Sequence, residues 1–168
     1  QVIVLRMGDY IGDNAPSAWM GVLLQQTDHG FTLSTPGPRD LPHTWAYLPD
    51  AARVAAELGA RKAELPAWSQ FHFRGYRVSF NGIADTLRHV TGREVKLKRF
   101  PWWALRLMAP FSVLFRGLLE MRYLWNHEVN LDDGALQRFL GRPVPQTPLG
   151  DALMALLRMK APTGWNAC

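Results

Sequence analysis

The stretch Val2-Ile3-Val4-Leu5-Arg6-Met7-Gly8-Asp9-Tyr10-Ile11-Gly12 decides how the chain is interpreted. Its first four residues are apolar without interruption, and three of them are β-branched. Such a run predicts a strand that is covered on both faces, as in a parallel sheet. The glycines and short polar residues that follow predict a loop over residues 6–14. Open α/β sheets bind ligands at the carboxyl ends of their strands, so we expect this loop to lie at a ligand site.

Hydrophobic periodicity predicts further strands and helices along the rest of the chain. Strands are expected over residues 31–33, 43–48, 71–73 and 94–99, the last at a sheet edge. Helices are expected over 17–26, 49–59 and 79–92, twice within 101–125 with a division at Pro110, over 132–141, and from Thr147 onward. Strands that alternate with helices indicate an α/β fold.

Composition indicates one globular domain and excludes a disordered chain. The sequence has 168 residues, of which 48% are hydrophobic and 20% charged. Its single cysteine, Cys168, cannot form an internal disulfide, so nothing requires an oxidising compartment and we expect a cytoplasmic protein. The longest uncharged run within 101–125 has nine residues, against roughly 20 for a membrane-spanning helix. We therefore expect no transmembrane segment.

The net charge of +5 is concentrated in the middle third of the chain. Residues 67–130 carry 10 basic and 4 acidic side chains. Arg93, Lys96, Lys98 and Arg99 alternate with apolar residues or flank them, which is typical of a solvated edge strand, and we expect no nucleic-acid partner.

No complete set of catalytic or cofactor-binding residues is present. The five histidines show no ligand spacing, so we expect no metal site. No two glycines stand two or three positions apart, and no tyrosine is followed four residues later by lysine. Gln1 leads directly into an apolar strand, and we expect the printed sequence to be a piece of a longer protein.

Four segments in this order resemble the C-terminal half of an extended short-chain dehydrogenase/reductase, in the NAD-dependent epimerase/dehydratase family. Leu5-Arg6-Met7-Gly8-Asp9-Tyr10-Ile11-Gly12 is similar to the family's Arg-Pro-Gly-like turn, with Met7 in place of proline. His43 to Ala52 resembles its strand-to-helix segment. Residues 71–79 resemble its short strand and capped helix, and residues 131–153 its closing segment.

The resemblance implies the C-terminal part of a Rossmann-like NAD(P)-binding fold plus a small substrate-binding α/β region. Residues 1–168 would form the substrate-binding half, with 1–14 and 43–60 at the edge of the Rossmann core. The intact protein would bind NAD or NADP and a small carbonyl, hydroxyl or sugar-like substrate, and it could be a homodimer. The family's catalytic tyrosine and lysine and its glycine-rich loop would lie upstream, so this chain alone would be inactive.

The same resemblance implies which residues line the site. The cofactor-binding residues would be Met7, Gly8, Tyr10 and Ile11, and the substrate-binding residues would be Asn14, Trp19, Trp45 and Tyr47. Core packing is the alternative for the last three of these, and Trp45 and Tyr47 share one strand face. Asp50 is interpreted as a helix-start residue. His43 stands where nucleotide-sugar enzymes of the family place a diphosphate-binding arginine, so we do not expect a nucleotide-sugar substrate.

Residues 101–125 allow a second interpretation of function. The segment combines aromatic side chains with arginines, which is the composition of an amphipathic helix at a membrane interface. The aromatic residues are Trp102, Trp103, Phe111, Phe115 and Trp125, and the arginines are Arg106, Arg116 and Arg122. Two lid helices with buried apolar faces explain the same pattern and are the interpretation we favour. The alternative is a non-enzymatic or peripheral-membrane interaction domain.

Overall fold

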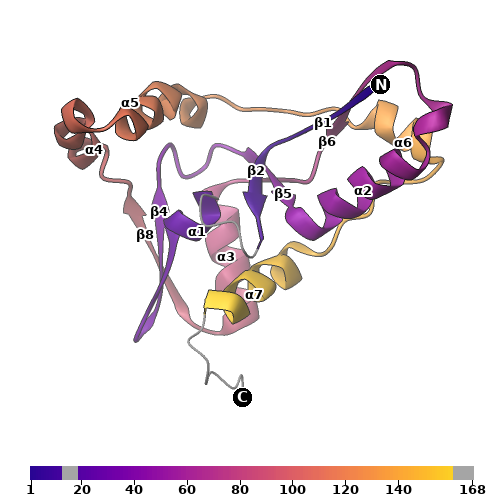
Figure 1. The fold of residues 1–168 in the computed structure, drawn as a ribbon. Coiled ribbons are helices and arrows are strands. Elements are labelled where there is room, and N and C mark those ends of the chain that lie inside the picture. Colours follow the sequence, from indigo (N-terminus) through magenta and orange to yellow (C-terminus); the bar gives the residue numbers. More distant parts are fainter. Residues whose placement is uncertain (13–18, 161–168) are drawn as a thin grey trace. The chain divides into compact units, whose positions relative to one another are not determined.

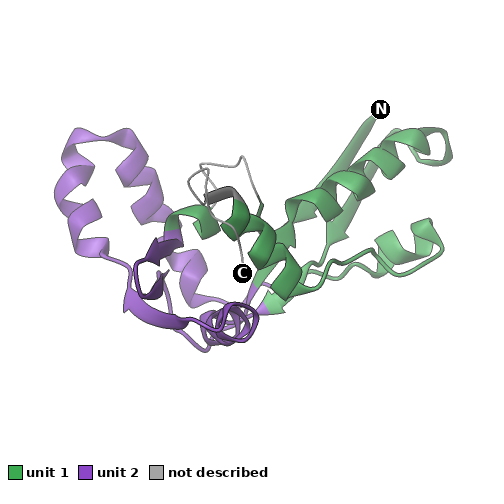
Figure 2. Ribbon diagram, turned by 90° about the horizontal axis from the view of Figure 1, so that it is seen from below, with its two compact units in different colours: residues 1–22, 44–77, 130–168 green, residues 23–43, 78–129 purple. Residues whose placement is uncertain are grey.

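The computed structural model describes residues 1–12 and 19–160, which form two compact units (Figure 2). Unit 1 comprises residues 1–22, 44–77 and 130–168, and unit 2 comprises residues 23–43 and 78–129. Each unit combines strands with helices, so the α/β fold class predicted from the sequence is confirmed.

Unit 1 is built on two short sheets (Figure 1). Strand β1 (Val2–Met7) pairs in parallel with β6 (Trp68–Phe73), and β2 (Asp9–Ile11) pairs in parallel with β5 (His43–Tyr47), which β7 (Tyr76–Val78) also joins. Ile3, Leu5 and Met7 pack on the core of the unit, but Val2 on the opposite face is 47% exposed. Within the described residues, the prediction of a strand covered on both faces is therefore wrong for one face of β1.

The helices of unit 1 supply the other side of its core. They are α1 (Trp19–Leu23), α2 (Leu48–Ala60), α6 (Gly134–Leu140) and α7 (Leu149–Lys160), with a 3₁₀ turn η1 (Lys62–Glu64) after α2. Val54 and Leu58 stand four residues apart on α2, and Leu136 and Leu140 do so on α6. All four lie in one buried cluster with Phe71 and Phe73 of β6.

Unit 2 contains a three-stranded sheet covered by one helix. Strand β4 (Gly30–Thr35) pairs antiparallel with β3 (Leu24–Thr27) and parallel with the edge strand β8 (Glu94–Arg99). Helix α3 (Phe80–Thr91) packs on this sheet. The Ser79 hydroxyl accepts a hydrogen bond from the Gly82 backbone N–H at 3.2 Å, and Gly92 ends the helix at a φ of 64°. Both ends of this helix lie where the sequence predicts them, at residues 79 and 92.

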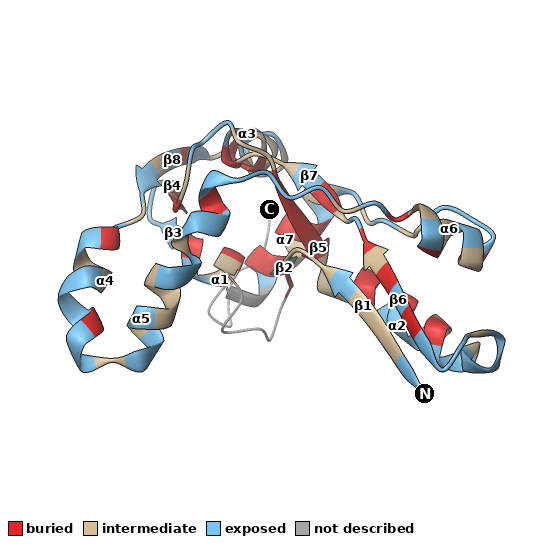
Figure 3. Ribbon diagram, turned by 90° about the horizontal axis from the view of Figure 1, so that it is seen from above, coloured by how far each residue is buried: buried red, intermediate tan, exposed pale blue. Residues whose placement is uncertain are grey.

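A helical hairpin completes unit 2. It consists of α4 (Trp102–Met108), the 3₁₀ turn η2 (Ala109–Phe111), α5 (Val113–Glu120) and the 3₁₀ helix η3 (Met121–Asn126). We call residues 102–126 the hairpin. Pro110 lies in the turn between the two helices, as predicted, because proline cannot supply the backbone N–H that a continuous helix requires there. The prediction that their apolar faces are buried holds for Trp102 and Trp125 and is wrong for many of the other large apolar side chains, since most of the hairpin is exposed in Figure 3.

One predicted helix and one predicted loop are wrong in part, because short strands occupy some of their residues. The helix predicted over 17–26 ends at Leu23, because residues 24–27 instead form β3 against β4. The loop predicted over 6–14 contains β2, which lies beside β5. Three- and four-residue strands are stabilised by their partner strands rather than by their own residues, so no local pattern predicts them.

Candidate functional site

The predicted cofactor residues lie at the carboxyl end of β1 and along β2. Met7 is half-buried and ends β1, Tyr10 is exposed on β2, and Ile11 is fully buried. A Cβ atom at Gly8 would lie 2.0 Å from the Thr44 carbonyl oxygen, so the close approach of two backbones requires glycine here. Only Tyr10 of this group presents a large side chain to solvent, and contacts with a cofactor stay a prediction for all four.

The predicted substrate residues are separated by the structure into three environments. Trp45 is fully buried, Tyr47 is half-buried at the start of α2, and Trp19 is half-buried at the start of α1. Asn14 lies outside the described residues. Trp45 and Tyr47 do share a face of β5, since they are aligned with Asp9 and Ile11 of the neighbouring strand. Their contact with a substrate remains a prediction.

Asp9 is a candidate site residue that the sequence reasoning missed. It stands on β2 between two of the predicted cofactor residues and is aligned with Trp45. Burial raises the pKa of its carboxyl group to about 6. A carboxyl group with such a pKa can exchange a proton near neutral pH. The signal that was available is an acidic residue within a loop predicted at the end of a strand.

Asp50 has a structural role, as interpreted from the sequence. It is buried in the first turn of α2 and accepts hydrogen bonds from the Thr147 backbone N–H at 2.6 Å and the Thr147 hydroxyl at 2.9 Å. The Tyr76 hydroxyl donates to the Thr147 carbonyl oxygen at 2.6 Å, and burial raises the pKa of Tyr76. Asp50 and Tyr76 therefore hold the segment that leads into α7.

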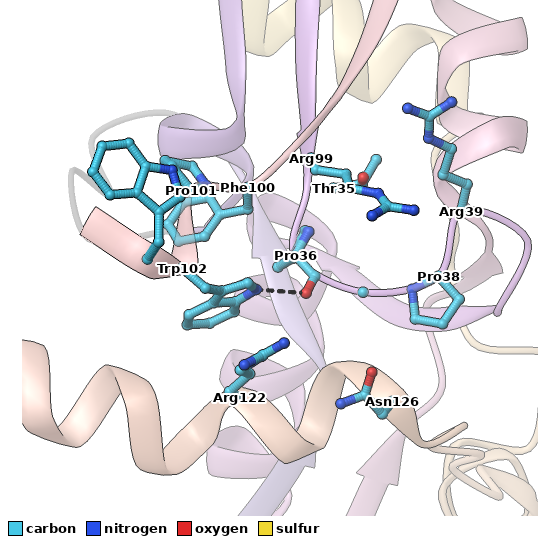
Figure 4. A pocket seen from close by; sticks show the side chains of 12 residues that line it. Thr35, Pro36, Pro38, Arg39, Arg99, Phe100, Pro101, Trp102, Arg122 and Asn126 are labelled. Atoms are coloured by element: carbon cyan, nitrogen blue, oxygen red, sulfur yellow. Dashed lines mark hydrogen bonds between the residues drawn. The ribbon is translucent and has the colours of Figure 1, made fainter. Parts of the chain in front are cut away.

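A pocket of about 770 Å³ lies entirely within unit 2 (Figure 4). Its walls come from the end of β4 and the following loop, the end of β8, the start of α4, and η3. Three arginines line it from these separate segments, namely Arg39, Arg99 and Arg122. We call this cavity the arginine pocket.

Aromatic side chains form a second part of the wall and hold its shape. The indole N–H of Trp102 donates a hydrogen bond to the Pro36 carbonyl oxygen at 2.8 Å, which joins α4 to the loop after β4 (Figure 4). The Arg122 guanidinium lies 5.5 Å from the centre of the Trp102 ring. Phe100 and Trp102 are in edge contact, with ring centres 4.9 Å apart. The pocket therefore combines flat apolar surfaces with positive charge.

The three arginines of the pocket have no acidic partner within the described part of the chain. No aspartate or glutamate belongs to the described lining, and none forms an ion pair with these guanidinium groups. The Arg39 guanidinium instead donates to the Leu97 carbonyl oxygen at 3.0 Å. Such a site fits an anionic group, because guanidinium donors match carboxylate and phosphate oxygens.

The described residues contain neither a metal centre nor a membrane-spanning helix. Within 1–12 and 19–160, no group of three or more His, Cys, Asp or Glu side chains is arranged to hold a metal ion. In that part of the chain no helix has the length and apolar character needed to cross a membrane.

Comparison with known proteins supports the fold. One solved structure similar to this chain is that of a "putative epimerase" from Burkholderia cenocepacia J2315. The match covers 95% of this chain and 47% of that chain, with a TM-score of 0.58 and 14% sequence identity. This chain thus spans about half the length of that protein. No family model and no curated protein sequence matches the chain. The chain has an α/β, Rossmann-like fold of the epimerase type.

Proposed function

We propose that this chain is the substrate-binding half of an NAD(P)-dependent oxidoreductase of the epimerase or dehydratase type. The observation that carries the proposal is the structural similarity to the "putative epimerase" over nearly the whole chain. The arginine pocket adds a cavity large enough for a small-molecule substrate. Asp9, the first residue of β2, adds a carboxyl group with a raised pKa just after the end of β1.

The residues of this chain would bind only one end of a nicotinamide cofactor. The pyrophosphate of NAD(P) binds to backbone N–H groups of a glycine-rich loop at a helix start, and the glycines of the printed sequence lack that spacing. The exposed Tyr10 side chain would provide a surface for the nicotinamide end. The cofactor would supply hydride transfer. Its phosphate site and a tyrosine and lysine for proton transfer would come from sequence outside residues 1–168.

The substrate would carry an anionic group. Arg39, Arg99 and Arg122 would bind a phosphate or carboxylate of the substrate, and the Trp102 and Phe100 rings would exclude water from one side. Trp102 would position Arg122 through their stacking. Because the arginines come from three segments of unit 2, the pocket would bind its anion without a residue from unit 1.

Cofactor binding tests the enzymatic part of the proposal. The protein expressed from its complete reading frame is titrated with NADH and with NADPH, and binding is followed by nicotinamide fluorescence. Binding of one of them at micromolar concentration is expected, together with weaker binding by Tyr10→Ala. Residues 1–168 alone are expected to bind neither. Failure of the complete protein to bind both nucleotides would contradict the proposal.

Calorimetry with inorganic phosphate and pyrophosphate tests the pocket separately. Arg99→Gln is expected to weaken anion binding about tenfold, because a charge-assisted hydrogen bond is lost. The matched control is Arg138→Gln, which removes an exposed arginine on α6. Equal anion affinity in parent, Arg99→Gln and Arg138→Gln would show that the pocket is not an anion site.

A further inference from the structure

We propose that the hairpin docks on an anionic lipid surface, with its exposed apolar side chains in the membrane interface and its arginines at the lipid phosphates. The proposal does not rest on the enzymatic function, because it concerns the exposed side chains of residues 102–126, of which Trp103 also lines the arginine pocket.

The first observation is the exposure of large apolar side chains on the hairpin. Trp103 is 69% exposed, Phe111 85%, Val113 74% and Leu114 67%. Further members of this surface are Leu107, Met108, Met121, Tyr123 and Leu124. Scattered apolar side chains are ordinary on a protein surface, whereas large apolar side chains gathered on one hairpin are typical of an interaction site. Figure 3 shows much of the hairpin as exposed, with intermediate and buried stretches between.

The second observation is that the exposed residues share faces of the two helices. Trp103 and Leu107 stand one helical turn apart on α4, and Leu114 and Met121 stand two turns apart along α5 into η3. The two helices pack against each other, so these faces belong to one hairpin. Its turn carries Phe111, the most exposed of the group.

The third observation is that the hairpin is held to unit 2 by a different set of residues. Trp102 is buried and hydrogen-bonds to Pro36, and Trp125 is buried with its ring centre 5.0 Å from that of His43 and 5.9 Å from that of Phe80. These anchors lie at the first residue of α4 and near the end of η3. The outer side chains are thus not needed to attach the hairpin to its own unit.

Charge decides which partner fits this surface. Arg106 and Arg116 are exposed on α4 and α5, and Glu120 is the only acidic residue in 101–125. No described acidic residue forms an ion pair with these arginines. A second copy of the hairpin would bring arginines against arginines, which opposes self-association. An anionic lipid surface attracts them, and tryptophan and tyrosine are favoured at membrane interfaces.

The lengths of the two helices indicate how the hairpin would bind a membrane. Helix α4 has 7 residues and α5 has 8. Each is far shorter than the roughly 20 residues that cross a bilayer. The hairpin would therefore lie in the interface with one side in lipid, and the rest of unit 2 would remain in water.

The test is co-sedimentation of the purified protein with vesicles. Vesicles of phosphatidylcholine alone are compared with vesicles containing about one third phosphatidylserine. We expect binding only to the anionic vesicles, and at least about tenfold weaker binding when the salt concentration rises from about 0.1 M to 0.5 M. Absence of binding to anionic vesicles at low salt would overturn the proposal.

Paired variants locate the surface. Trp103→Ser with Phe111→Ser is expected to weaken vesicle binding at least about tenfold, because buried apolar contact with lipid is lost. The matched control is Trp68→Ser, since Trp68 is 63% exposed on β6 outside the hairpin. Arg106→Gln with Arg116→Gln is expected to weaken binding to anionic vesicles by a similar factor, with Arg138→Gln as its control.

Folding and oligomeric state are measured on the same variants, by circular dichroism and light scattering. Unchanged folding and unchanged mass are expected. If the Trp103 and Phe111 substitutions prevent folding, Leu114→Ser with Leu107→Ser takes their place. If hairpin variants change the molecular mass but bind vesicles as the parent does, the hairpin is a protein interface and the proposal is wrong.

Discussion

Helices α3 and α5 follow the same kind of sequence pattern and have opposite burial. Each begins after a serine, Ser79 or Ser112, and each carries apolar residues at helical spacing. The apolar face of α3 is buried on its sheet, whereas α5 has no buried residue. Helical periodicity therefore predicts that a helix has an apolar face, but it does not identify what covers that face. In α3 that face stabilises the fold, and in α5 it is available for binding.

The largest expected contrast is between two phenylalanines. Phe80 of α3 is 1% exposed, so Phe80→Ala is expected to lower the free energy of unfolding by about 3–5 kcal/mol. Phe111→Ala, at the hairpin turn, is expected to change it by less than about 0.5 kcal/mol. Urea unfolding measures both. A large loss of stability from Phe111→Ala would mean that a surface of the protein covers the hairpin turn.

The free energy of unfolding is expected to depend on pH through His43, whose ring lies beside that of Trp125. Burial lowers the pKa of His43 from its ordinary value of 6.5, although a hydrogen bond with the Trp125 backbone opposes this. Within the described residues its Nε2 atom has no hydrogen-bond partner. Below pH 6.5 the unfolded chain binds a proton that the folded chain does not, so stability falls as the pH is lowered through this value.

Urea unfolding between pH 7.5 and pH 5 measures this dependence. His43→Leu is expected to reduce the loss of stability on acidification, because the variant has no proton to bind at this position. His127→Gln is the control, since His127 is exposed near the end of the hairpin. The same pH profile in the parent and in His43→Leu would show that His43 does not link folding to pH.

A smaller difference in stability is expected between alanine substitutions at the serines that precede α3 and α5. The Ser79 hydroxyl caps α3, so Ser79→Ala is expected to cost about 1 kcal/mol of stability. Ser112 makes no such hydrogen bond at the start of α5, and Ser112→Ala is expected to be nearly neutral. Thermal unfolding of the two variants provides the comparison, and an equal loss from both would contradict it.

The smallest expected difference in stability is between alanine substitutions at one glycine of α5 and one glycine of α3. A Cβ atom at Gly117 of α5 would meet no atom within 4 Å, so Gly117→Ala is expected to stabilise the protein by about 0.5–1 kcal/mol and to leave vesicle binding unchanged. A Cβ atom at Gly82 of α3 would lie 2.7 Å from a methyl group of Val78, and Gly82→Ala is expected to bring no gain. Melting temperatures distinguish the two. A destabilised Gly117→Ala would indicate a neighbour packed against α5.

Local signals predicted much of the fold. Ser79, Gly92 and Pro110 act through their own backbone chemistry, and the structure confirms the helix limits that they predict. Strands β2, β3 and β7 have three or four residues and depend on pairing with other strands, which for β2 and β7 is β5, a strand distant in sequence. Their existence is decided by tertiary contacts, which a single sequence does not display.

The candidate site was less predictable than the helix limits, because it also depends on tertiary contacts. Arg39, Arg99 and Arg122 come from segments far apart in the chain and meet only after unit 2 has folded. No spacing between them carries a signal. Asp9 stood within the predicted loop, but its raised pKa results from burial, which depends on the completed structure. The hairpin pattern allowed both burial and exposure of its apolar side chains, and in the structure many of them are exposed.

Hydrogen–deuterium exchange of the purified protein, with and without anionic vesicles, tests the contrast between α3 and α5 most directly. Amides of α3 are expected to be protected in both conditions, because its apolar face is buried within unit 2. Amides of α4 and α5 are expected to exchange faster in the free protein and to become protected when anionic vesicles are added. Equal protection of the hairpin and α3 in the free protein, with no change on adding vesicles, would contradict the account.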